Sequence, residues 1–345
     1  MATQSQSDRS TRPAVGLRPS RGSSWLGEVT ARYGLLIAWV IVVVIFGVLP
    51  KTSATFLTVN NLATIFGSQA VIAILTLALV VPLTAGDYDL SIAFVLTLSS
   101  MLIAVLNVNQ HWPILAAMAV ALAAGAFVGV VNAAVIIFFR IDSLIVTLGT
   151  GTFIGGIVLW ISSTNTISGV SPSLVNWVIT NRFLGIPLEF YYALAIGVVM
   201  WYVFMFLPIG TKLLFVGRGR NVARLSGINV ERIRLGGFVV SGVISALAGI
   251  VYAGTIGGAD PTSGTQLLLP AFAAAFLGAT SIYPGRFNPI GALVAVYFLV
   301  TGITGFQLLG AQSYVQDLFY GGALVVAVAL SQLARGRRAL EAGAG

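Results

Sequence analysis

Two carboxylates two positions apart, Asp87 and Asp89 in the segment AGDYDLS, are the nearest approach to a catalytic pair in this sequence. Neighbouring carboxylates can bind a divalent ion, and membrane enzymes that hold a diphosphate through Mg²⁺ use such groups. Those enzymes need a second acidic cluster, whereas the other acidic residues of this chain are scattered singly. The pattern favours a cap, in which Asp89 accepts from free N–H groups at the start of a helix. Lining or gating a solute path is the alternative.

Small and hydroxylated residues form a second pattern in SLIVTLGTGTFIGG, residues 143–156. Glycines let helices approach closely and threonines offer hydrogen bonds between them, so helix packing explains most of this segment. Asn132, in GVVNAAV, is expected to bond to a neighbouring helix. The alternative for all these groups is a polar lining for a neutral, hydroxyl-rich solute. The residues of such a translocation path would be Asp87, Asp89, Ser91, Asn132, Thr147, Gly149 and Thr150.

The segment GRGRNVARLSGIN, residues 217–229, concentrates three arginines in a sequence that is otherwise poor in charge. A short helix here would place Val222 and Leu225 on one face. Arg220 and Arg224 would then lie on the opposite face. The segment is therefore predicted to be amphipathic.

The ends of this helix, over residues 221–226, are also marked in the sequence. Asn221 is expected to cap its start, and Gly227 suits the left-handed turn that ends a helix. A membrane surface would accept such a helix, but one or two turns bury little apolar area. A protein socket that receives the apolar face and pairs with the arginines explains the same features better. The sequence thus predicts that a partner binds this segment.

Composition sets the fold class. The chain has 345 residues, of which 57% are hydrophobic and 8% are charged, and its mean hydropathy is +0.97. An average soluble protein carries about 25% charged residues. Continuous apolar runs of about 20 residues are typical of transmembrane helices and unlike the alternating pattern of β-barrel strands. We therefore predict an all-α, polytopic membrane protein.

Several function classes are disfavoured by residue types that are rare or missing. The sequence has no cysteine and one histidine, which argues against a thiolate site or a His/Cys metal site. Ionisable residues are nearly absent from the middle of the apolar runs, which argues against an ion-driven pump and an intramembrane enzyme. Basic residues that flank spans explain the net charge of +8, so no nucleic-acid partner is expected.

Ten membrane spans can be drawn, and the basic residues orient them. The expected spans are 33–50, 60–83, 89–108, 114–139, 143–162, 189–207, 234–256, 266–282, 289–306 and 313–333. Lysine and arginine gather on the cytoplasmic side of a membrane. With a cytoplasmic N-terminus, only Lys51 and Arg182 of the 18 basic residues fall outside. Both termini are therefore expected in the cytoplasm.

The chain divides into a tail, a membrane domain and a second tail. Residues 1–32 are polar and basic, so we expect a disordered cytoplasmic tail. Residues 33–335 form the membrane domain, which includes a cytoplasmic loop at 208–233, and residues 336–345 form a short cytoplasmic tail. The first span is interpreted as a permanent membrane span rather than as a cleaved signal peptide, because both the polar tail before it and its apolar stretch are long.

The spans also suggest an internal repeat. Spans two to five and seven to ten are interpreted as two copies with opposite membrane orientation, as in inverted repeats. Each copy opens with a span that ends at a Gly-rich, Asp-containing break, at Gly86–Asp89 and Gly257–Gly264.

These segments resemble the permease subunits of ribose/xylose-type bacterial ABC importers, the branched binding-protein-dependent permease family. ARLSGINVERIRL (223–235) resembles the family's cytoplasmic loop, and AGDYDLS resembles its Gly-Gly-Ile-Asp-Leu-Ser stretch. DSLIVTLGT (142–150) resembles Pro-Phe-Ile-Val-Thr-Leu-Gly-Thr. Three further matches follow in the family's order, and these are SGVISALAGIVYAG, LLLPAFAAAFLGATSIYPGRFNPIGALV and YVQDLFYGGALVVAVAL. The resemblance covers roughly residues 35–335.

The resemblance implies a transport subunit of the bacterial inner membrane that translocates a monosaccharide. In that family two permease subunits form the pore, and an extracytoplasmic binding protein delivers the sugar. ATP and Mg²⁺ bind a separate ATPase subunit, so no cofactor or metal is expected on this chain, which has no Gly-x-x-x-x-Gly-Lys-[Ser/Thr] loop. Membrane lipid surrounds the pore. The residues that match the family's ATPase-coupling loop are Arg218, Arg220, Asn221, Val222, Ala223, Arg224, Leu225, Ser226 and Gly227.

Two departures from the family pattern shape these expectations. Asn221 stands where the family's loop has an acidic residue, so a dedicated ATPase partner is expected. Tyr88 replaces the family's isoleucine and would narrow any opening beside Asp87. An ion-coupled secondary transporter and an intramembrane lipid- or isoprenoid-modifying enzyme are the competing hypotheses. The sequence leaves open which sugar is carried and whether the pore is a homodimer or a heterodimer.

Overall fold

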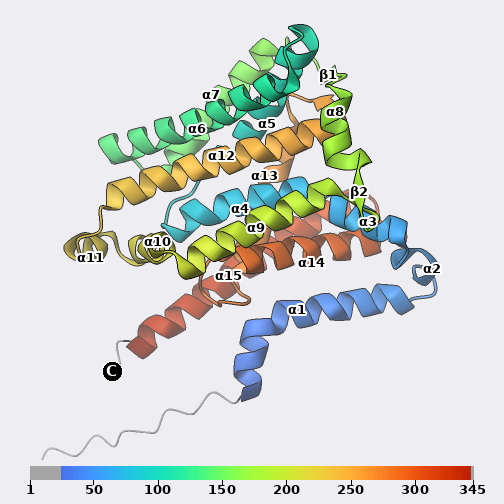
Figure 1. The fold of residues 1–345 in the computed structure, drawn as a ribbon. Coiled ribbons are helices and arrows are strands. Elements are labelled where there is room, and N and C mark those ends of the chain that lie inside the picture. Colours follow the sequence, from blue (N-terminus) through green and yellow to red (C-terminus); the bar gives the residue numbers. More distant parts are fainter. Residues whose placement is uncertain (1–24, 343–345) are drawn as a thin grey trace, which may run out of the picture.

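The computed structural model describes residues 25–342, and the side chains of residues 32–329. This part of the chain is a bundle of helices with four two-residue strands (Figure 1). Residues 1–24 of the predicted tail lie outside the described residues. The rest of that tail, from residue 25, belongs to helix α1 (Trp25–Val48), which therefore begins earlier than the expected span. At the other terminus α15 (Tyr314–Ala342) continues into the expected tail, whose residues 343–345 are not described.

Each of the ten expected spans coincides with apolar helix. Seven segments within the described residues are long and apolar enough to cross a membrane. They are α3 (Val59–Gly67) with α4 (Ala70–Thr84), α5 (Ile92–Ala104) with the π-helix η1 (Val105–Asn109), α6 (Ile114–Phe139), α7 (Ser143–Ile161), α9 (Leu188–Phe206), α12 (Val230–Ile256) and α14 (Pro289–Leu308). Shorter apolar helices lie in α1, in α13 (Ser263–Gly278) and in α15. The all-α, polytopic prediction is confirmed.

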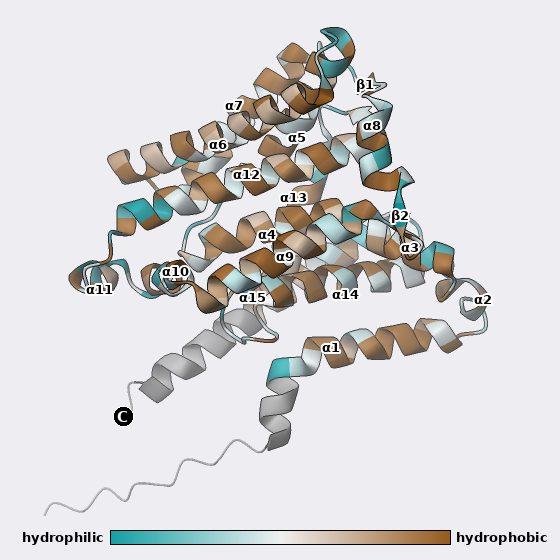
Figure 2. Cartoon of the chain, viewed as in Figure 1, coloured by the Kyte–Doolittle hydropathy of each residue, from teal (hydrophilic) through white to brown (hydrophobic). Residues whose placement is uncertain are grey.

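Helix α4 is the centre of the bundle. All of its residues are buried, and it contacts α9, α12, α13 and α14. A helix that is apolar on every side is stable only when protein or lipid surrounds it completely. The second expected span is not one helix, however, because the chain breaks at Ser68 and Gln69 between α3 and α4. Figure 2 shows apolar residues along the spans and polar residues gathered toward the two ends of the bundle.

The two ends of the bundle carry different connections (Figure 1). One, here called the α11 end, carries α10 (Pro208–Arg218) and α11 (Arg220–Leu225). The opposite one, here called the α8 end, carries α3, α2 (Ser53–Phe56), α8 (Pro172–Val175) and the π-helix η2 (Asn176–Thr180). Two short antiparallel ladders also form there, one from β1 (Ile167–Ser168) and β4 (Gly258–Ala259), the other from β2 (Arg182–Phe183) and β3 (Ile186–Pro187).

Helices α6 and α12 cross closely because glycines meet at the crossing. A Cβ atom built on Gly242 would lie 2.2 Å from the carbonyl oxygen of Gly125, and one on Gly129 would lie 2.4 Å from that of Phe238. Small residues let membrane helices approach to backbone contact. This contact positions α12, which carries residues of the site described below.

We predict that Gly242→Ala destabilises the protein. The added methyl group has no space at the crossing, and overpacking of this kind costs about 1–3 kcal/mol. Gly236→Ala in the same helix is the matched control, because its Cβ would meet no atom within 4 Å. The melting temperature of each detergent-solubilised variant measures the effect. Equal melting temperatures for the two variants would contradict the close packing of α6 on α12.

Candidate functional site

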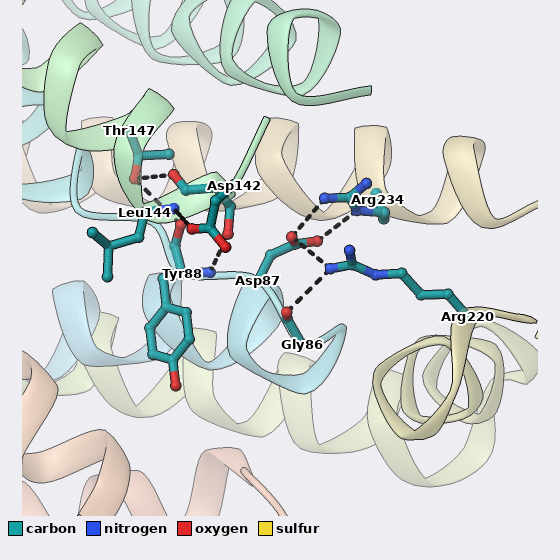
Figure 3. Close-up of polar contacts among 9 residues, drawn as sticks. Gly86, Asp87, Tyr88, Asp142, Leu144, Thr147, Arg220 and Arg234 are labelled. Atoms are coloured by element: carbon teal, nitrogen blue, oxygen red, sulfur yellow. Dashed lines mark hydrogen bonds and ion pairs between the residues drawn. The ribbon is translucent and has the colours of Figure 1, made fainter. Parts of the chain in front are cut away.

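Asp87 lies in the turn after α4, where two arginines from distant segments bind its carboxylate (Figure 3). Arg234 of α12 makes a two-point contact, with Nε 2.7 Å from Oδ2 and Nη2 2.6 Å from Oδ1. Arg220 of α11 donates from Nη2 to Oδ1 over 2.8 Å, and to the carbonyl oxygen of Gly86 over 3.1 Å. These residues, Asp87, Arg220 and Arg234, are here called the Asp87 cluster.

Burial explains why the Asp87 cluster needs both arginines. The Asp87 side chain is 2% exposed and that of Arg234 12%, whereas that of Arg220 is 42% exposed. A buried carboxylate without a partner costs several kcal/mol, and charge-assisted, two-point bonds from arginine offset this cost. Arg234 therefore contributes most of the compensation, since water screens part of the Arg220 charge.

A backbone contact ties the same elements together. Gly217, in the last turn of α10, lies so close to the end of α4 that a Cβ on it would be 2.0 Å from the carbonyl oxygen of Thr84. Only glycine permits this approach. Through Gly217 and the Asp87 cluster, the α10–α11 segment is fixed to the end of the central helix.

Helix α11 itself matches the expected amphipathic helix in most respects. Val222 is 63% exposed and Leu225 is 90% exposed, while Ala223 faces the protein and is fully buried. Gly227 has a φ of 80°, the left-handed conformation expected after the helix. Arg224 pairs with Glu231 at the start of α12. The two arginines of α11 thus bind acidic groups of this chain, and the apolar side chains are left exposed.

The expected cap at Asn221 is wrong. Helix α10, which the sequence did not predict, runs to Arg218, and Gly219 alone separates it from α11. The helix therefore starts at Arg220, so Asn221 lies within its first turn and no side chain caps it. An asparagine does cap the next helix, where Asn229 Oδ1 accepts from the N–H of Arg232 over 2.9 Å.

Four of the seven predicted path residues join Ser241 in one hydrogen-bonded network, and all of these except Thr150 are buried. Ser241 donates to Asp89 Oδ2 over 2.8 Å, and Ser91 donates to Asp89 Oδ1 over 2.6 Å. Asn132 Nδ2 donates to Ser91 Oγ over 2.8 Å, and Thr150 Oγ1 donates to Asn132 Oδ1 over 2.6 Å. The network joins α12, α6 and α7 to the start of α5.

The remaining predicted path residues have separate positions. Thr147 Oγ1 accepts from the N–H of Leu90 over 3.0 Å and donates to the carbonyl oxygen of Ser143 over 2.7 Å. Gly149 is exposed, and no atom would lie within 4 Å of a Cβ built on it. Asp87 belongs to the Asp87 cluster. Their role in a translocation path stays a prediction, and the hydrogen bonds of Thr147 favour helix packing.

Asp89 does not cap α5 in the expected way. Its Oδ1 accepts the N–H of Ser91 over 3.1 Å, and Ser91 is the residue before the first helical one. Asp89 therefore orders the turn that leads into the helix. Burial raises the pKa of its carboxyl group, and the hydrogen bonds from Ser91 and Ser241 partly oppose this rise.

Sequence reasoning missed Arg234 as a partner of Asp87. The two residues are far apart in the chain, and Arg234 sits at the start of an expected span, where a basic residue needs no special explanation. The available signal was the rarity of charge, because an ionisable residue in a membrane protein is expected to have a partner.

The family of the chain follows from comparison with known proteins. The model of the family described as branched-chain amino acid transport system / permease component matches residues 61–328. The chain belongs to this family. It is therefore the permease component of an ABC importer and not an enzyme, and the predicted resemblance is confirmed. No solved structure matches the chain.

Curated members of the permease family are similar over most of their length. The D-allose transport system permease protein of Escherichia coli (strain K12) is 31% identical over 302 residues, which cover 88% of this chain and 92% of that protein. The ribose import permease protein of the same strain is 30% identical, covering 88% and 94%. The L-arabinose ABC transporter permease protein of Azospirillum brasilense is 29% identical, covering 94% and 95%.

We predict that Asp87→Asn destabilises this permease strongly and that Asp89→Asn does not. Asp87→Asn leaves Arg234 buried without a counter-charge, at a cost of about 3 kcal/mol, the lower end of the range for broken buried pairs. Asp89 has no cationic partner, so its replacement costs about 1 kcal/mol, the worth of an ordinary hydrogen bond.

The Asp87→Asn and Asp89→Asn variants are compared by melting temperature and by hydrogen exchange over residues 208–233. Exchange in this segment should rise in Asp87→Asn and stay unchanged in Asp89→Asn. In the double variant Asp87→Asn, Arg234→Gln the loss should be less than the sum of the two single losses. Equal effects of Asp87→Asn and Asp89→Asn would show that the arginines do not hold the segment.

Proposed function

We propose that this permease imports a monosaccharide, and that an ATPase subunit docks on α11. The observation that carries the proposal is the pair of exposed apolar side chains, Val222 and Leu225, on a helix fixed to the central span by the Asp87 cluster. The ATPase binds and hydrolyses ATP with Mg²⁺, and this chain supplies the path. A second permease subunit completes the pore.

The distribution of basic residues indicates that the α11 end faces the cytoplasm. Of the 18 lysines and arginines, all but Lys51 and Arg182 fall on the side that carries residues 208–233 and both termini. The α8 end then faces the outside of the inner membrane, where a binding protein delivers the solute.

The contacts of α11 suggest how ATP hydrolysis reaches the path. Movement of the ATPase carries α11 with it, because Val222 and Leu225 are seated in the ATPase. Arg220 transmits the movement to Asp87 at the end of α4, and Gly217 keeps α10 in contact with the same turn. Rigid-body motion of the spans then opens the path toward one side at a time.

The solute class rests on relatives and on charge. The named relatives transport D-allose, ribose and L-arabinose, all of which are neutral. The spans of this chain offer hydroxyl and amide groups but few charged side chains, which suits a neutral solute. We therefore place the solute among the monosaccharides.

Docking predicts a specific effect of Leu225→Asp. A carboxylate in an apolar socket is desolvated without a partner, so the ATPase subunit should no longer co-purify with the permease in mild detergent. Leu184→Asp is the matched control, because it makes the same change at another exposed leucine, 80% exposed, in the turn between β2 and β3 at the α8 end. Undiminished recovery of the ATPase with Leu225→Asp would remove α11 as the docking site.

The solute prediction is tested with the complete importer in proteoliposomes. D-Allose, D-ribose and L-arabinose are added outside the vesicles together with the importer's binding protein. The ATPase faces the inside, where ATP is either enclosed or left out. Leucine serves as the comparison, because the family description names branched-chain amino acids. ATP-dependent uptake of at least one of these sugars and none of leucine is expected. ATP-dependent uptake of leucine without any sugar would contradict the assignment.

A further inference from the structure

A polar pocket lies at the α8 end, opposite to α11, between the interrupted second span, the end of α14 and the start of α15. Its volume is about 280 Å³, close to the lower end of the sizes typical of small-molecule sites. Nothing in the sequence singled it out, because its residues come from three separate segments. The residues that the argument uses are Asn61, Gln69, Thr304, Gln307, Gln316 and Tyr320.

The chemistry of the pocket is that of neutral hydrogen-bonding groups. Amide side chains from α3, α14, α15 and the α3–α4 break line it, together with hydroxyl groups that include Thr304 and Tyr320, and none of its lining residues is charged. An amide offers both donors and acceptors, and so does each hydroxyl group of a sugar. An ionic solute would be desolvated here without a counter-charge. The lining therefore suits a neutral, polyhydroxylated ligand.

One of these groups, the Gln69 side chain, has unused hydrogen-bonding capacity. Gln69 Oε1 is the one buried side-chain nitrogen or oxygen atom without a hydrogen-bond partner in the part of the chain that the structure describes. The other end of the same amide donates to Ser68 Oγ over 3.3 Å. A buried acceptor without a partner is unfavourable, and a donated hydroxyl hydrogen would satisfy it.

The interruption of the second span brings Gln69 to this place. Helix α3 ends at Gly67 and α4 begins at Ala70, so Ser68 and Gln69 lie between two helices within one membrane crossing. Discontinuous helices are a common means of placing polar groups against a solute inside a transporter. The buried hydroxyl-bearing ring of Tyr320 closes the side of the pocket formed by α15.

We propose that this pocket binds the imported sugar, as the first site that the sugar occupies after leaving the binding protein. The assignment rests on the proposed function, since it takes the solute to be a monosaccharide and the α8 end to face outward. Asn61, Gln69 and Thr304 hold its hydroxyl groups, and Gln307 and Gln316 line the pocket beside it.

The test uses the absence of cysteine from the sequence. Gln307→Cys and Gln316→Cys each introduce a single thiol into the pocket, from two different helices. Gln312→Cys is the matched control. Gln312 is an exposed glutamine in the connection between α14 and α15, and it does not line the pocket. Each purified variant is treated with N-ethylmaleimide in the presence of increasing D-allose, D-ribose or L-arabinose, and the rate of alkylation is measured.

The transported sugar should slow alkylation of both pocket cysteines at least about threefold at saturation, while the Gln312→Cys rate stays constant. Gln69→Leu, made in the Gln307→Cys protein, should raise the half-protecting sugar concentration about three- to tenfold, as expected for one lost hydrogen bond.

Two results separate the possible failures. If the unsubstituted importer takes up one of the three sugars and that sugar protects neither cysteine, the pocket assignment is wrong and the importer function stands. If the unsubstituted importer takes up none of them and none of them protects, the monosaccharide function fails and the pocket assignment fails with it. A Gln69→Leu variant with unchanged protection would also overturn the role given to Gln69.

Discussion

One buried carboxylate organises the α11 end of this protein. Asp87 is removed from water at the end of the most buried helix, and two arginines from other segments compensate its charge. In a chain with 8% charged residues, burying such a cluster has a large free-energy cost. The cluster joins the end of α4 to α11 and α12. The position of α10 and α11 depends on this pair of contacts and on the glycine at position 217.

The two ends of the bundle then have distinct chemistry. The α11 end combines a charged, rigid connection with an apolar exposed face, which suits a partner that must push or pull on the spans. The α8 end carries amide and hydroxyl groups around a pocket beside the interrupted second span. Between the two ends, helix α4 runs through the centre of the bundle and contacts α9, α12, α13 and α14. In the proposed function, α4 is the packed element that carries a movement from the α11 end toward the α8 end.

Hydropathy was sufficient to predict where the apolar helices lie, because burial in lipid or protein requires continuous apolar helix. Within the described residues, however, seven of the ten expected spans are long enough to cross a membrane, and the second is interrupted. The short amphipathic helix and the left-handed Gly227 followed from local pattern in the same way. The features that the sequence did not reveal depend on contacts between distant segments. Asp87 meets Arg234 only after α4 and α12 have packed together, and the pocket draws its lining from three segments. Asn221 lost its expected role because an unpredicted helix precedes it.

The central claim is that α11 transmits force to the spans through the Asp87 cluster. The most direct test is the number of ATP molecules hydrolysed per sugar imported in the reconstituted importer that carries Arg220→Gln. Arg220 is half-exposed, so its loss should leave folding and ATPase docking largely intact while it weakens the connection to Asp87. The account predicts ATP hydrolysis near the unsubstituted rate with several-fold more ATP used per sugar. An unchanged ratio, with the ATPase still bound, would contradict it.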